Sequence, residues 1–124
     1  MANQSAETPR EEISRRILAL IGLAHRAGRT ALGAGAVTSM VVRGKKPLVF
    51  VASDCGSNQR EKAAKLTPVA GVVYDRIDRV DLARALGRSE LTIVAVDGRE
   101  FVRGLLKILE TAPAAGDGVG KSED

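Results

Sequence analysis

The segment of this chain best suited to binding a ligand is Gly33-Ala34-Gly35-Ala36-Val37-Thr38, which opens an expected helix and is followed by Ser39. The first N–H groups of a helix have no acceptor within the helix and lie at the positive end of its dipole, so they bind phosphate well. Glycine carries no side chain, which lets a ligand come close to the backbone. The segment therefore predicts a phosphate-binding helix start.

Five basic residues flank this segment in the sequence, namely Arg26, Arg29, Arg43, Lys45 and Lys46. We expect the end of the first helix and the basic turn at residues 44–47 to flank the glycine segment on one side of a sheet. The bases would then neutralise phosphates around the helix start. The alternative is that they are scattered over a solvated surface.

Charge is unevenly distributed along the chain. The formal net charge is +4, but residues 13–109 hold 17 bases against 8 acids, while both ends are acidic. A basic body suggests a polyanionic partner, although a soluble domain that is merely basic has the same composition. With no Trp, one Tyr and two Phe, the chain lacks the aromatic platforms on which single-strand RNA binders stack bases.

The glycine segment has a second interpretation, as a nucleotide site. It reads G-x-G-x-x-T, which lacks the third glycine of the dinucleotide-binding pattern, and Asp54 stands about 20 residues further on at an expected strand end. Residues 29–32 are too short and too polar for the buried first strand of that pattern. Nucleotide binding through Gly33–Thr38 is kept as an alternative.

No residue pattern in the chain indicates catalysis. His25, the only histidine, lies inside the first expected helix, where a surface or phosphate-facing position is the simpler interpretation. Cys55, the only cysteine, would need a neighbouring base or helix start to become a reactive thiolate. Asp75, Asp78 and Asp81 lack the spacing of a metal-binding loop. The sequence predicts a protein that is not an enzyme and that uses no cofactor.

Apolar spacing and breaker residues divide the chain into alternating helices and strands. The expected helices cover residues 11–27, 33–43, 58–66 and 78–86, with a last one after Asp97-Gly98; the expected strands cover 29–32, 48–52, 69–74 and 91–96. The last three strands have the apolar composition of buried strands. Asn58 and Glu61 resemble a capping box, and Asp78 is expected to cap its helix.

This order predicts an α/β fold, a three-layer α/β/α sandwich with a mixed four-stranded sheet. We expect one domain over residues 11–110, between a flexible tail at 1–10 and a flexible acidic tail at 111–124. No apolar stretch approaches the roughly 18 residues of a membrane span, and the first ten residues have no apolar run of a signal peptide. The sequence thus predicts a cytoplasmic protein, which we expect to be a monomer.

A set of short segments occurs in a characteristic order: Leu23–Arg29, Leu32-Gly33, Val37-Thr38, Arg43–Lys45 and Leu48–Asp54. Together they resemble the L-seven-Ae family of ribosomal and kink-turn-binding proteins. Ala52–Asp54 followed by Asn58 and Lys62, and Leu82–Gly87, are most similar to the small bacterial members. The resemblance spans roughly residues 13–109, nearly the whole expected domain.

The resemblance implies an α/β/α sandwich that binds structured RNA, such as ribosomal RNA, and has no catalytic activity. In that family the corresponding helix start reads G-x-Asn-Glu with a Lys soon after, and these side chains contact the sheared G·A pairs of a kink-turn. Gly33 and Thr38 match the family, whereas the Asn-Glu pair is Gly35-Ala36 here and the Lys position is Ser39. With Gly35-Ala36 in place of Asn-Glu, the backbone and the basic residues can still contact RNA. No side chain at these two positions can hydrogen-bond to the base edges.

Two further positions match the family. Asp54 corresponds to an acid near a flipped base, and residues 87–90 correspond to a second contact loop. We therefore expect RNA contacts at Arg26, Arg29, Gly33, Ala34, Gly35, Thr38, Ser39, Arg43, Lys45, Lys46, Asp54 and Arg88. The departure at Gly35-Ala36 leaves a second alternative, a protein-interaction or ribosome-associated member of the family without base readout.

Overall fold

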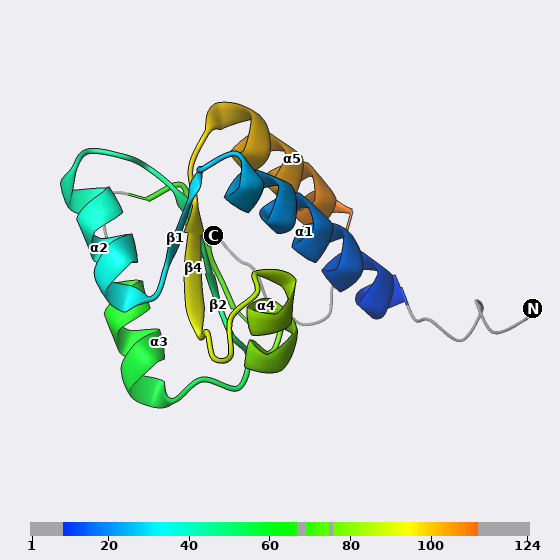
Figure 1. Ribbon diagram of the computed structural model, residues 1–124, viewed down its shortest axis with the longest axis horizontal. Helices are drawn as coiled ribbons and strands as arrows, with labels where there is room; N and C mark the ends of the chain where they lie inside the picture. Colours follow the sequence, from blue (N-terminus) through cyan, green and yellow to red (C-terminus); the bar gives the residue numbers. More distant parts are fainter. Residues whose placement is uncertain (1–8, 67–68, 75, 112–124) are drawn as a thin grey trace, which may run out of the picture.

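The computed structural model describes residues 9–66, 69–74 and 76–111, which form a four-stranded sheet between two layers of helices (Figure 1). This confirms the predicted three-layer α/β/α sandwich with a mixed sheet. Among the described residues, no helix has the length and apolar character needed to cross a membrane. In chain order the elements are α1 (Pro9–Arg26), β1 (Thr30–Leu32), α2 (Ala34–Val42), β2 (Leu48–Val51), α3 (Ser57–Ala64), β3 (Gly71–Val73), α4 (Arg79–Ala85), β4 (Ile93–Val96) and α5 (Arg99–Glu110).

The strand order in the sheet is β1-β4-β2-β3. β4 lies between β1 and β2 and runs antiparallel to both, whereas β2 and β3 are parallel. Val96 pairs with Thr30 on one side and with Leu48 on the other, and Ile93 pairs with Val51. Because β4 is hydrogen-bonded on both edges and all four of its residues are buried, it forms the centre of the domain.

This topology differs from that of a dinucleotide-binding domain. Such a domain starts with a βαβ unit in which the first two strands are parallel neighbours. Here β1 is antiparallel to its neighbour β4, and β2 pairs with β4 and β3. The nucleotide-binding alternative for Gly33–Thr38 therefore lacks the fold that it requires.

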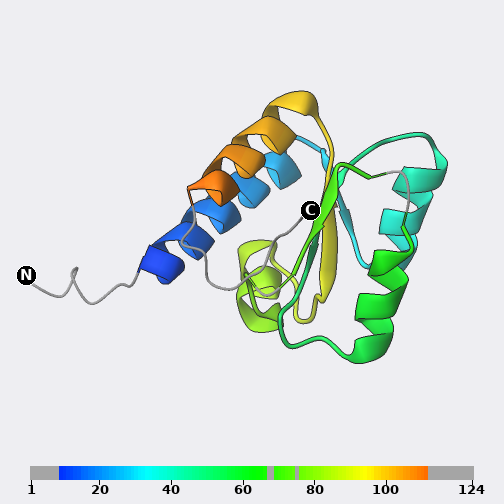
Figure 2. The ribbon, with the colours of Figure 1, turned by 180° about the vertical axis from the view of Figure 1, so that it is seen from behind.

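Alternate residues of the central strands face the two helix layers. Leu48 and Phe50 of β2 join the core beneath α1, α4 and α5, whereas Val49 and Val51 join the core beneath α2 and α3. The view from behind in Figure 2 shows the same two layers, with α1 and α5 side by side on one of them. This alternation is the period of two that strands impose on side chains.

The start of α1 differs from the expected boundary. The helix begins at Pro9, so Pro9 and Arg10, which were expected in the tail, are helical. Proline is well suited to a first helical turn because its missing N–H has no acceptor there. Thr111, also expected in a tail, is the residue that follows α5, and the rest of the two expected tails, residues 1–8 and 112–124, lies outside the described residues.

Two expectations in the middle of the chain are wrong. Asn58 and Glu61 do not form a capping box, because α3 already begins at Ser57 and no side chain caps it. The expected buried strand at 69–74 is shorter, and its three residues are only half-buried, because β3 lies at the edge of the sheet. The expected cap of α4 is confirmed, since the Asp78 side chain accepts a hydrogen bond from the Asp81 N–H.

Candidate functional site

Three connections meet at one end of the sheet. The Gly33 N–H donates to the Ile93 carbonyl over 2.9 Å, and the Ala52 N–H donates to the Thr92 carbonyl over 2.8 Å. The start of α2, the connection from β2 to α3 and the connection from α4 to β4 are therefore neighbours. We call this region the glycine end and define it as residues 33–35, 52–57 and 87–92.

The start of α2 is open. Gly33 has a φ of 92°, and no side chain caps the helix. This φ lies in the left-handed region that favours glycine. A Cβ placed on Gly33 or Gly35 would meet nothing within 4 Å, so the backbone is uncovered. No side chain therefore occupies the start of α2, where the first N–H groups of a helix have no acceptor within the helix.

A small pocket of about 240 Å³ lies between α2 and α3 at this end. Ala34 and Thr38 of α2 form one wall, and Ala63 and Leu66 form part of the other. Gln59 also lines the pocket, and its Oε1 is buried and accepts no hydrogen bond from the described residues. A buried acceptor without a donor is costly, which makes Gln59 a candidate ligand-binding residue that the sequence gave no signal to find.

Further basic residues lie at or beside the glycine end. Lys62 of α3 and Lys65, which follows α3, line the pocket, and Arg88 is exposed on the connection from α4 to β4. The Arg60 guanidinium lies 4.8 Å from the centre of the Tyr74 ring. Burial raises the pKa of Tyr74 above its usual value, and the positive charge of Arg60 opposes that shift. Lys62 and Lys65 were not predicted as site residues, although Lys62 belongs to the matched family segments.

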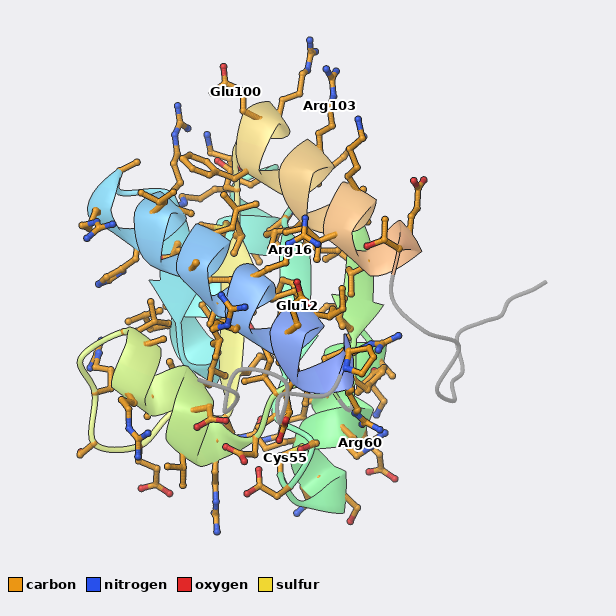
Figure 3. All side chains as sticks on the ribbon, turned by 90° about the vertical axis from the view of Figure 1, so that its right-hand side faces the viewer. Glu12, Arg16, Cys55, Arg60, Glu100 and Arg103 are labelled. Atoms are coloured by element: carbon orange, nitrogen blue, oxygen red, sulfur yellow. The ribbon has the colours of Figure 1, made fainter. Side chains whose placement is uncertain are left out.

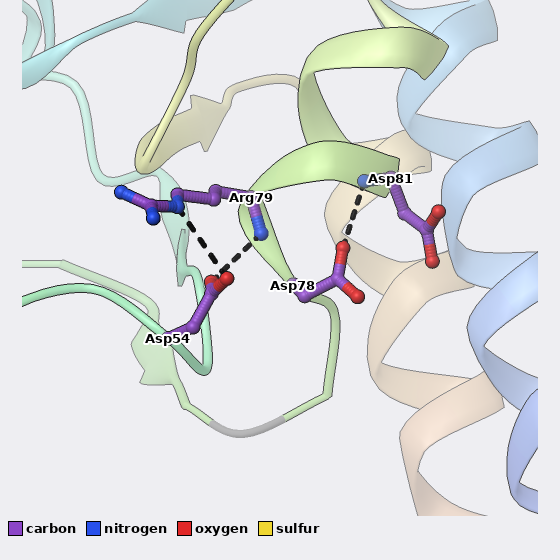
Figure 4. Close-up of polar contacts among 4 residues, drawn as sticks. All are labelled: Asp54, Asp78, Arg79 and Asp81. Atoms are coloured by element: carbon purple, nitrogen blue, oxygen red, sulfur yellow. Dashed lines mark hydrogen bonds and ion pairs between the residues drawn. The ribbon is translucent and has the colours of Figure 1, made fainter.

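Asp54, predicted as an RNA contact, has a structural role that the sequence did not indicate. Its carboxylate accepts a hydrogen bond from the Arg79 N–H over 2.9 Å, and it lies 3.4 Å from the Arg79 guanidinium (Figure 4). Asp78 accepts from the Asp81 N–H over 2.8 Å beside it. Two carboxylates therefore stabilise the start of α4, and one of them comes from the glycine end.

The five bases expected around the glycine segment lie at the opposite end of the sheet. The Asp97 N–H donates to the Arg29 carbonyl over 2.8 Å, next to the end of β4 that is remote from Ile93. The Asp97 carboxylate lies 3.5 Å from the Arg29 guanidinium and 3.9 Å from the Lys45 ammonium. We define the Asp97 end as Arg29, residues 44–47 and residues 97–98.

The remaining bases share this location. Arg26 ends α1, Arg43 follows the last residue of α2, and Lys46 lies in the turn before β2. Because α2 has nine residues, its two ends are about 13 Å apart at 1.5 Å per residue. The expectation that the five bases surround Gly33 is therefore wrong. Thr38 lines the pocket with Ala34, whereas Ser39 lies within α2, nearer to its end at Val42 than to its start.

The residues considered for catalysis are not assembled into a site. The exposed His25 lies with Nδ1 2.8 Å from the Thr30 hydroxyl, and Cys55 is half-buried in the connection from β2 to α3. Within the described ranges, no group of three or more His, Cys, Asp or Glu could hold a metal ion. Asp75 lies outside those ranges.

Comparisons with known proteins identify the family and the fold of the chain. Residues 15–101 match the model of the Ribosomal protein L7Ae/L30e/S12e/Gadd45 family. A protein of unknown function from Bacillus halodurans is 28% identical with a TM-score of 0.65, over 76% of this chain and 96% of that one. A 15.5kD RNA binding protein from Giardia lamblia is 21% identical with a TM-score of 0.62, over 82% and 88%, which shows a shared fold. No curated protein matches the chain.

Proposed function

The chain belongs to the ribosomal protein L7Ae/L30e/S12e/Gadd45 family, and from this premise we propose that it binds structured RNA through its glycine end and catalyses no reaction. The observation that carries this proposal is the open start of α2 above a pocket lined by Lys62 and Lys65. The partner is a ribosomal or another folded non-coding RNA in the cytoplasm.

Phosphates bind at the start of α2 in this proposal. The unused N–H groups after Gly33 donate to phosphate oxygens, and Gly35 lets the RNA backbone come close. Lys62 and Lys65 neutralise adjacent phosphates from α3 and the residue after it, and Arg88 does so from the connection to β4. These contacts fix the position of the RNA without reading its sequence.

The pocket receives one unstacked base. Single-stranded loops and bends of RNA present bases that proteins bind by apolar contacts and by hydrogen bonds to the base edge. Ala34, Ala63 and Leu66 supply the apolar walls, and the amide of Gln59 supplies a buried acceptor for a base N–H. Ligand binding would then satisfy the polar atom that the free protein leaves unpaired.

Shape rather than side-chain readout would select a kink-turn. Gly35 and Ala36 occupy the positions of the family's Asn-Glu pair, and neither has a side-chain donor or acceptor. Preference for a sharply bent RNA must then come from the open helix start and the pocket.

The experiment is a titration of the protein with a kink-turn hairpin and with a straight duplex of equal length, each at two salt concentrations. We expect salt-sensitive binding that is tighter for the hairpin, since only the bent RNA offers an unstacked base. Equal binding of both RNAs would remove the kink-turn preference but keep RNA binding. Absence of binding to either RNA would refute the proposal and favour the protein-interaction alternative.

A further inference from the structure

A second hollow lies at the other end of the molecule. It is a groove of about 600 Å³ between α5 and the turn that carries Lys46. α5 packs against α1 at Gly104, where an added Cβ would come within 2.9 Å of Leu20. The groove follows the flank of α5 that contains Arg99, Arg103 and Lys107. It therefore lies beside the Asp97 end and shares no lining residue with the pocket at the glycine end.

The groove is basic. Lys46, Arg99, Arg103 and Lys107 line it, and within the described part of the chain none of the four has an ion pair. Of the two acids in the lining, Glu110 lies at the far end of α5, and Asp97 is neutralised by Arg29 and Lys45. The accessible charge of the groove is therefore positive.

The bases on α5 are regularly spaced. Arg99, Arg103 and Lys107 follow one another at intervals of four residues, so neighbouring positions are about 6 Å apart along one side of the helix. Arg103 and Glu100 project outward from α5 in Figure 3. Such a row can follow consecutive phosphates of one strand, which a cluster around a single point cannot.

The composition of the groove favours a polyanion over a protein partner. Its apolar lining consists of Val102, which is half-buried, and Leu106, which is 41% exposed. The other large exposed apolar residues, Leu23, Val42 and Val80, lie on other helices. The centre of a protein interface is poor in charged residues, whereas six of the nine residues that line this groove are charged.

We propose that this groove is a second RNA-contact surface, which holds the phosphate backbone of an RNA segment distinct from the one at the glycine end. The inference rests on the proposed RNA-binding function. Lys46, Arg99, Arg103 and Lys107 are the phosphate contacts, and Leu106 packs against ribose. One protein molecule would thereby hold two RNA segments at once, one at each end of the sheet.

The test uses the full chain saturated with unlabelled kink-turn hairpin and titrated with a labelled short RNA duplex. We expect a ternary complex of protein, hairpin and duplex. In the double variant Arg99→Gln and Arg103→Gln, we expect the duplex affinity to fall at least tenfold and the salt slope to decrease by about 2, while the affinity for the hairpin alone is unchanged. The matched control is Arg16→Gln with Arg84→Gln, two exposed bases on α1 and α4, which should leave duplex binding unaltered.

Three results would overturn the inference. The first is an equal loss of duplex affinity in both double variants, and the second is mutually exclusive binding of hairpin and duplex to the wild-type protein. The third is equally tight binding of poly-glutamate of matched charge, which would assign the groove to an acidic protein segment. If the hairpin does not bind but duplex binding depends on Arg99 and Arg103, the glycine-end proposal fails and the groove keeps its RNA contact.

Discussion

Arg29 and Asp97 are joined by two contacts, a backbone hydrogen bond of 2.8 Å from the Asp97 N–H to the Arg29 carbonyl and an ion pair of 3.5 Å between their side chains. Arg29 precedes β1, and Asp97 follows β4. The pair therefore connects the chain after α1 to the chain before α5. Lys45, 3.9 Å from the same carboxylate, adds the turn before β2 to this junction.

Replacing the acid of this junction should have a small effect on stability. In Asp97→Asn we expect the free energy of unfolding to fall by at most about 1 kcal/mol, because the bases are about half exposed and water weakens their ion pairs with Asp97. Urea denaturation of both proteins measures the difference. It should shrink in 1 M salt, where charges are strongly screened. A loss that persists at high salt would point to packing rather than charge.

The lysine pairs at the two ends of the sheet should differ in how much they contribute to hairpin affinity. We expect Lys62→Ala with Lys65→Ala to weaken binding of a kink-turn hairpin at least tenfold, because both line the pocket at the glycine end. Lys45→Ala with Lys46→Ala should change it about twofold or less at physiological salt, where the Debye length is about 8 Å. Each double variant loses two positive charges, so fluorescence titration compares their hairpin affinities at equal net charge. The reverse order would place the hairpin at the Asp97 end.

A charged residue at the start of α2 should move stability and binding in opposite directions. Gly35→Glu should stabilise the protein by about 0.5–1 kcal/mol, because the helix dipole favours an acid in its first turn and glycine is a poor helix former. The same carboxylate should repel phosphate and lower hairpin affinity at least tenfold. Thermal unfolding and titration give the two values.

The control for this variant is Gly35→Gln, which has the same size without the charge. Both side chains fit, since a Cβ at Gly35 meets nothing within 4 Å. We expect Gly35→Gln to keep most of the affinity. An equal loss in the two variants would show that bulk at this position, and not charge, blocks the RNA.

The buried amide of the pocket should also couple stability to binding. Gln59→Leu removes the unpaired Oε1. We therefore expect the free energy of unfolding to stay the same or to rise by up to about 1 kcal/mol. Hairpin affinity should fall about tenfold if this atom accepts a hydrogen bond from a base. Urea denaturation and titration are again the measurements. Unchanged affinity would exclude Gln59 as an RNA contact.

Tyr74 should make stability depend on pH in the alkaline range. Burial raises its pKa in the folded protein, whereas the unfolded value is about 10. The folded state thus binds the phenolic proton more tightly, so the resulting stabilisation is complete below pH ~10 and is lost as pH rises through the folded pKa. Denaturation of the wild type and of Tyr74→Phe on both sides of pH ~10 tests this. As pH rises above ~10, the free energy of unfolding of the wild type should fall relative to that of the variant. The same pH dependence in both proteins would contradict the expectation.

Much of the fold could be predicted from the sequence because its signals are local. The stripe Ile13, Ile17 and Ile21 predicts α1 by its helical spacing, and the run Leu48–Val51 predicts a buried strand by its composition. The half-buried state of β3 depends on its place at the sheet edge, which no local pattern encodes. Likewise, Asn58 fails as a cap because Gly56 already turns the chain into α3.

The candidate site was predicted in part. The open helix start at Gly33 follows from residue types alone, whereas the location of Lys45 and Arg29 depends on pairings between distant segments. Nearness in sequence suggested nearness in space, but α2 carries the chain across the domain before Arg43. The buried atom of Gln59 arises from the packing of α3 against α2, which also has no sequence signal.

β4 extends from the glycine end to the Asp97 end of the sheet. Thr92 lies at the glycine end and Asp97 at the opposite end, and the strand between them is held by hydrogen bonds to β1 and β2 along both edges. Five steps of about 3.4 Å give a span of about 17 Å. A strand paired on both sides cannot shorten or slip without breaking the sheet. Ligands held at the two ends would therefore be kept at a constant separation, which is set by the backbone geometry of β4.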